Sequence, residues 1–109
     1  MKFTNLLIPE VVLIEPCIHG DSRGYFLETY RHDLFEEAVQ REVSFVQDNE
    51  SKSSKGVIRG LHFQEPPYAQ AKLVRVIEGS VLDVAVDLRK DSQNFGKYVS
   101  AILTGENKN

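Results

Sequence analysis

Hydrophobic and polar residues alternate over short stretches along most of this 109-residue chain, as they do in half-buried β-strands. The alternation is clearest in residues 81–88, where the even positions are apolar and the odd positions include Asp83 and Asp87. Acidic residues that alternate with apolar ones usually mark the solvent side of a strand, so we expect both carboxylates to face water. Before this strand, residues 78–80 (Glu-Gly-Ser) would form a tight hairpin turn.

Other stretches of the chain are also typical of strands and are separated by Gly, Ser, Pro, Asn or Asp. They are residues 11–14, 25–30, 43–49, 56–63, 71–77 and 97–103. Many short strands at regular spacing favour a sandwich or a barrel. The sequence therefore predicts one mainly β domain over residues 1–109.

One segment has the periodicity of a helix instead. In residues 33–42 (DLFEEAVQRE), apolar side chains recur at i, i+4. Asp33 could cap this helix, and Glu36 has the spacing of a capping box. We expect one short helix here.

Composition excludes several classes of protein. The formal net charge is −3 and the cationic residues are scattered, so a nucleic-acid surface is not expected. Cys17 is the only cysteine, which excludes an internal disulfide. No apolar stretch is long enough to span a membrane, and the first residues lack the apolar core of a signal peptide. We expect a soluble, cytoplasmic chain with no membrane partner.

Two of the expected strands carry polar residues that a purely structural strand would not need. In residues 56–63, Arg59 and His62 are three positions apart and would lie on opposite faces of a regular strand. A bulge at Gly60 would turn both side chains toward one cavity. In residues 71–77, Lys72 would share an inward face with valines, which is costly unless the ammonium meets an anion or a wet pocket.

A histidine base beside an ammonium suits proton abstraction next to a carbonyl group, with the cation stabilising the oxyanion. Gln47, Asn49 and Gln64 would add uncharged donors and acceptors. Structural roles remain open: His62 could be a core or rim histidine, and Arg59 and Lys72 could be edge cations. Likewise, Arg23 and Asn49 could be turn residues.

A metal site is less favoured by the pattern. Small β-barrels often bind a transition metal through a His-x-His pair, but here the second position of the pair is Gln64. An amide is a poor ligand for that role.

Long motifs of the chain resemble the dTDP-4-dehydrorhamnose 3,5-epimerase family. They are DSRGYFLETY, FVQDNESKSSKGVIRGLHFQ, PPYAQAKLVRVIEGSVLDVAVDLRKDS and FGKYVSAIL, which together cover most of residues 21–103. The resemblance implies a cupin-type jelly roll. It also implies epimerisation at C3 and C5 of a dTDP-linked 4-keto-6-deoxyhexose, without a metal or organic cofactor.

The resemblance also implies roles for individual residues of this chain. His62 would be the base, Lys72 would stabilise the enolate oxygen, and Arg59 with Arg23 would bind the diphosphate. Substrate contacts would come from Gln47, Asn49 and Glu28, and Phe26 would pack on the thymine. Family members form homodimers in which N-terminal strands reach across, so Arg23, Phe26 and Glu28 would serve the neighbouring subunit.

Family members are longer than this sequence. Their second half supplies a further histidine, the tyrosine that returns a proton and the aspartate that pairs with the catalytic histidine. We therefore expect a jelly-roll domain that lacks the C-terminal part of the family pattern, acts slowly or not at all alone, and forms a dimer or higher oligomer. Two alternatives remain open: a dTDP-binding module without complete catalytic groups, and a shortened paralogue with a structural role.

Overall fold

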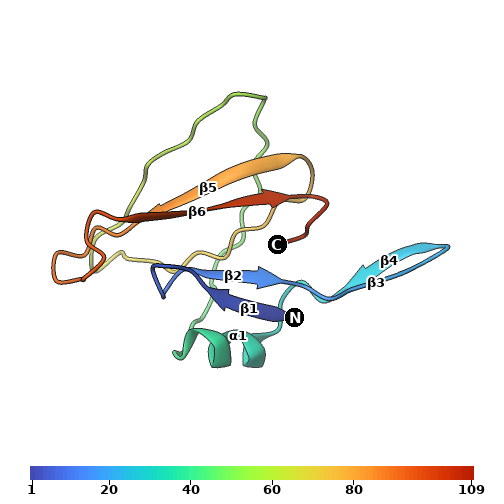
Figure 1. Cartoon of the computed structure of the whole chain (residues 1–109), viewed down its shortest axis with the longest axis horizontal. Coiled ribbons are helices and arrows are strands. Elements are labelled where there is room, and N and C mark those ends of the chain that lie inside the picture. Colours follow the sequence, from blue (N-terminus) through green and yellow to red (C-terminus); the bar gives the residue numbers. More distant parts are fainter. The chain divides into compact units, whose positions relative to one another are not determined.

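The chain is mainly β, with six strands and one helix in a computed structural model that describes residues 1–109 (Figure 1). The elements in order are β1 (Lys2–Asn5), β2 (Val12–Glu15), β3 (Ile18–Asp21), β4 (Gly24–Leu27), α1 (His32–Val39), β5 (Ser80–Val86) and β6 (Tyr98–Thr104). The strands form three two-stranded antiparallel sheets, β1–β2, β3–β4 and β5–β6. No helix has the length and apolar character needed to cross a membrane.

Two compact units make up the chain. The first unit contains Met1–Arg41 and Val74–Asn109, and it holds all of the strands and the helix. The second unit, Glu42–Leu73, has no helix or strand, and its backbone hydrogen bonds lie within short turns such as Val57 N to Ser54 O at 3.3 Å.

The strands at residues 11–14, 81–88 and 97–103 are confirmed, and β4 forms the first part of the expected 25–30 strand. The predictions of strands at 43–49, 56–63 and 71–77 are wrong. A strand exists only where a neighbour accepts and donates its backbone hydrogen bonds, and these three segments belong to none of the three sheets. Gly79 has a φ of +83°, but the hairpin expected at 78–80 does not form, since no strand precedes it.

The β5–β6 sheet buries the face opposite to the one expected. Val81 pairs with Leu103 and Ala85 with Val99, and both β6 partners are buried. Asp87 continues this face and is only 5% exposed, so the expectation that it faces water is wrong; Asp83 is half-buried. The opposite face presents the paired side chains of Leu82 and Ile102, which are 63% and 62% exposed.

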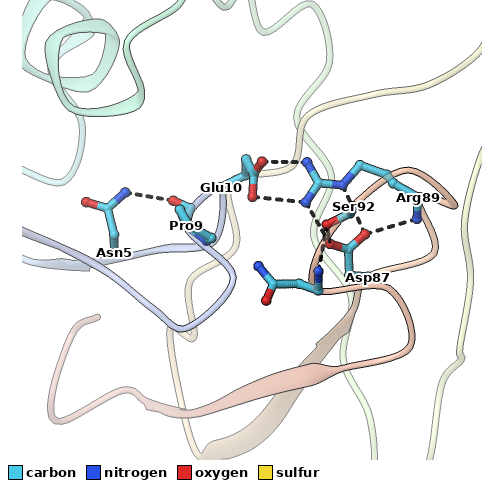
Figure 2. A network of polar contacts seen from close by, with 7 residues as sticks. Asn5, Pro9, Glu10, Asp87, Arg89 and Ser92 are labelled. Atoms are coloured by element: carbon cyan, nitrogen blue, oxygen red, sulfur yellow. Dashed lines mark hydrogen bonds and ion pairs between the residues drawn. The ribbon is translucent and has the colours of Figure 1, made fainter.

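Burial of Asp87 is possible because its carboxylate is fully hydrogen-bonded (Figure 2). Arg89 donates from Nε to Oδ1 at 3.0 Å and from Nη2 to Oδ2 at 2.7 Å, and Ser92 Oγ donates to Oδ2 at 2.6 Å. The same guanidinium binds Glu10 through Nη1 at 2.5 Å and Nη2 at 3.0 Å. This cluster therefore links the turn between β1 and β2 to the connection between β5 and β6.

The helix is confirmed, but it begins one residue earlier than expected. Its N-cap is Arg31, which makes no side-chain capping bond, so the prediction that Asp33 caps the helix is wrong. Asp33 instead lies in the first turn and accepts hydrogen bonds from Arg31 Nε at 2.8 Å and Nη2 at 3.0 Å. Glu36 completes no capping box; its Oε2 lies 3.4 Å from His32 Nε2.

Candidate functional site

Five of the eight expected site residues lie in the second unit, and their side chains are all exposed. They are Gln47, Asn49, Arg59, His62 and Lys72. The two amides contact each other, since Gln47 Nε2 donates to Asn49 Oδ1 at 3.3 Å. These two residues thus present adjacent uncharged donors and acceptors to solvent.

Arg59 is held by the loop that precedes it. Its Nε donates to Ser53 Oγ at 2.9 Å, and its Nη2 donates to the Lys52 carbonyl oxygen at 3.4 Å. These two contacts fix the plane of the guanidinium, and no carboxylate neutralises its charge. The cation is therefore available to an anion. Sequence reasoning missed Ser53, whose only signal is its place in the Ser- and Lys-rich run 51–55.

Gly60 has a φ of +128°, a backbone conformation that favours glycine. The β-bulge itself is wrong, because residues 56–63 are not a strand. A Cβ at Gly60 would lie 3.6 Å from His62 Cδ2, so the imidazole lies close to this glycine. The side chain of Arg59 points toward Ser53 instead, so Arg59 and His62 share no contact partner within the chain.

His62 and Lys72 have no hydrogen bond or ion pair within the chain, and each side chain is exposed. The prediction that Lys72 lies on the inward face of a strand is wrong, since residues 71–77 form no strand and Val74 is exposed. Both functional groups can therefore meet a ligand without first breaking a protein contact.

The other three expected residues belong to the first unit, on and after the β3–β4 hairpin. Arg23 lies in the turn and binds Asp21 through Nη2 at 2.7 Å and Nε at 3.2 Å. This contact raises the pKa of Arg23 and lowers the pKa of the Asp21 carboxyl, mainly through their side-chain hydrogen bonds. On β4, Phe26 is 72% exposed, and Glu28 follows the strand as an exposed carboxylate.

No group of three or more His, Cys, Asp or Glu side chains comes together in a way that could hold a metal ion. A hollow of about 110 Å³ in the first unit is lined by Tyr25, Leu27, Arg75 and Lys108 among others, and the Lys108 ammonium lies 5.0 Å from the Tyr25 ring centre. None of the eight candidate residues lines this hollow.

Known proteins resemble the chain over nearly all of its length. A sequence profile described as dTDP-4-dehydrorhamnose 3,5-epimerase matches residues 5–109. The enzyme of that name from Shigella flexneri is 59% identical over 108 residues, which are 99% of this chain and 60% of that protein. The chain thus spans about three fifths of the length of this curated relative.

Solved structures agree with the sequence match. The dTDP-4-dehydrorhamnose 3,5-epimerase of Elizabethkingia anophelis NUHP1 has a TM-score of 0.93 and 51% identity over 99% of this chain and 59% of that one. The Legionella pneumophila dTDP-6-deoxy-D-glucose-3,5-epimerase, solved with dTDP-4-keto-L-rhamnose, has a TM-score of 0.92 and 50% identity over 98% of this chain and 56% of that one.

The mainly β structure and these neighbours place the chain in the class of cupin-like sugar-nucleotide epimerase folds. Within that class, the chain belongs to the dTDP-4-dehydrorhamnose 3,5-epimerase family.

Proposed function

We propose that this chain acts in the epimerisation of dTDP-4-dehydro-6-deoxy-D-glucose at C3 and C5, which gives dTDP-4-dehydro-L-rhamnose. The observation that carries the proposal is the family match over residues 5–109, which includes all eight candidate site residues. The ligand of the Legionella pneumophila structure supports the choice of substrate.

Chemistry at both carbons would begin with loss of a proton next to the C4 ketone. His62 is proposed as the base, since a neutral imidazole accepts a proton near neutral pH. Lys72 is proposed to stabilise the enolate oxygen with its ammonium group. Support comes from their exposure and from the absence of any protein partner that would compete for either group.

Different residues would bind the diphosphate and the thymine base of the substrate. Arg59 and Arg23 are proposed to bind the diphosphate; Asp21 occupies Nε and Nη2 of Arg23, so Nη1 remains for the ligand. Phe26 offers an exposed ring on which thymine could stack. Gln47, Asn49 and Glu28 are proposed to contact the nucleotide and the sugar.

We further propose a single jelly-roll epimerase domain that assembles as a homodimer or higher homo-oligomer in the cytoplasm. In that assembly, Arg23, Phe26 and Glu28 would complete the site of the neighbouring subunit. Each strand of the three two-stranded sheets has one unpaired edge, which favours association with a second copy.

Deuterium exchange tests the proposed reaction directly. We expect NMR in D₂O to show deuterium entering the substrate at C3 and C5, and His62→Ala to slow this entry about 10²- to 10⁴-fold. The matched control is His19→Ala, which removes another exposed histidine and should leave the rate unchanged. If His62→Ala exchanged as fast as the wild type, His62 would not be the base. Binding of dTDP without exchange would instead favour a nucleotide-sugar binding module.

A further inference from the structure

The side chain of Arg59 is anchored at two points of the loop that comes before it. Ser53 Oγ accepts a hydrogen bond from Nε at 2.9 Å, and the Lys52 carbonyl oxygen accepts one from Nη2 at 3.4 Å. All three residues belong to the second unit, so the contacts are internal to it. The shorter contact comes from a side chain and can be removed by a point mutation.

Anchoring matters because an exposed arginine is otherwise mobile. A free guanidinium must give up the conformational entropy of a long side chain when it binds an anion. A guanidinium that is already held in place loses less conformational entropy upon binding. Of its five N–H groups, Ser53 and Lys52 occupy two, so the others remain for oxygen atoms of a ligand.

We propose that Ser53 is a positioning residue, which orients the guanidinium of Arg59 so that its free N–H groups bind a diphosphate. This inference rests on the proposed function, in which Arg59 binds the diphosphate of the substrate. Ser53 acts through Arg59. Removing the Ser53 hydroxyl group leaves the charge of Arg59 in place, but the guanidinium is then no longer held in one orientation. The effect should therefore appear only where Arg59 and a diphosphate are both present.

Calorimetric titration of the full chain with dTDP and with inorganic pyrophosphate tests this role. We expect Ser53→Ala to lower the affinity for both ligands about 3- to 10-fold, the range for loss of one hydrogen bond to a charged but exposed group. Ser53→Thr keeps the hydroxyl group and should stay within about 2-fold of the wild type. The matched control is Ser54→Ala, because the Ser54 hydroxyl group has no contact with Arg59 and its loss should change neither affinity.

A double-mutant cycle separates positioning from a general effect on the loop. In an Arg59→Ala background, Ser53→Ala should have no further effect on either affinity. A purely structural serine would weaken binding equally in both backgrounds. Arginine NMR gives a second readout: Ser53→Ala should shift the Arg59 Nε–Hε resonance and speed its exchange with water, whereas Ser54→Ala should not.

The outcomes separate this inference from the proposed function. Equal affinities for wild type and Ser53→Ala, or an unchanged Nε–Hε resonance, would overturn the role of Ser53 and leave the epimerase proposal intact. Ser53-dependent binding of pyrophosphate without binding of dTDP would support Ser53 and contradict the proposed substrate. Failure of the wild-type chain to bind either ligand would overturn both.

Discussion

At the scale of single residues, Asp87 is a buried carboxylate that accepts hydrogen bonds from Arg89 and Ser92. The hydrogen bonds from Arg89, and then the one from Ser92, hold its pKa well below the ordinary value of 3.8. Arg89 likewise lowers the pKa of Glu10, mainly through their side-chain hydrogen bonds. An acid whose pKa is lower in the folded state contributes stability above its unfolded pKa, and this contribution is lost as pH falls through the folded pKa.

The isosteric variant Asp87→Asn should therefore destabilise the chain most at neutral pH. We expect the melting temperature at pH 7 to fall by about 5 °C, and the difference from wild type to shrink as pH falls from 4 toward 2. Thermal unfolding followed by circular dichroism across this range measures both effects. Asp91→Asn is the control, because Asp91 lies in the same connection but is exposed and has no hydrogen-bonded partner. Identical melting curves for the two variants at every pH would contradict the role of the cluster.

At the scale of elements, the end of β6 depends on a close backbone approach. Gly105 N donates to Gly79 O at 3.0 Å, and a Cβ on Gly105 would lie only 2.5 Å from Ile77 O. No side chain fits there unless the backbone moves. Glycine at this position is therefore required by packing.

Gly105→Ala should lower the free energy of unfolding by about 1–3 kcal/mol, the usual cost of overpacking. Urea unfolding measures this change. Gly20→Ala is the matched control: a Cβ at Gly20 would be 3.7 Å from Gly24 O, an ordinary contact, so its effect should stay within about 0.5 kcal/mol. If Gly105→Ala were as stable as Gly20→Ala, the backbone of residues 77–78 could move aside without lowering the free energy of unfolding.

Some strands of this chain could be predicted from the sequence, and others could not. β5 was predictable because its alternation is long, and β6 because it is a mainly apolar run that follows a segment rich in polar residues. Which face is buried was not predictable, because the charge of Asp87 is matched by Arg89 two residues later, and this guanidinium also binds the distant Glu10. The segments around Arg59 and Lys72 have strand-like composition, but composition does not supply a pairing partner.

At the scale of the whole molecule, many apolar side chains lie at the surface. Leu82 and Ile102 form an exposed cross-strand pair, and Ile58 is 90% exposed. Unpaired strand edges add donors and acceptors that a second copy could satisfy. Exposed apolar area of this kind favours self-association.

We expect sedimentation velocity of the 109-residue chain to show a dimer or higher oligomer at micromolar concentration. Ile102→Lys places a charge in the exposed apolar pair and should shift the distribution toward smaller species. Ser100→Lys is the control, since it adds the same charge on the same face at a position that is already polar. A monodisperse wild-type monomer would contradict the proposed assembly.

The prediction of candidate site residues from the sequence depended on single residues with unusual neighbours. His62 and Lys72 stood out because a structural strand would not need them, and Arg59 because it is next to Gly60. Ser53 could not be found in this way, since its role depends on a contact across six positions of irregular chain. Such contacts have no periodicity, so only the coordinates show them.

The ion pair of Glu10 with Arg89 joins positions that are 79 residues apart, and this separation has a consequence for synthesis. Ribosomes add about 5–20 residues per second, so Glu10 waits about 4–16 s for its partner to be made. During that interval the turn between β1 and β2 lacks the guanidinium of Arg89. The contact that links this turn to the β5–β6 connection thus cannot form before Arg89 has been added to the nascent chain.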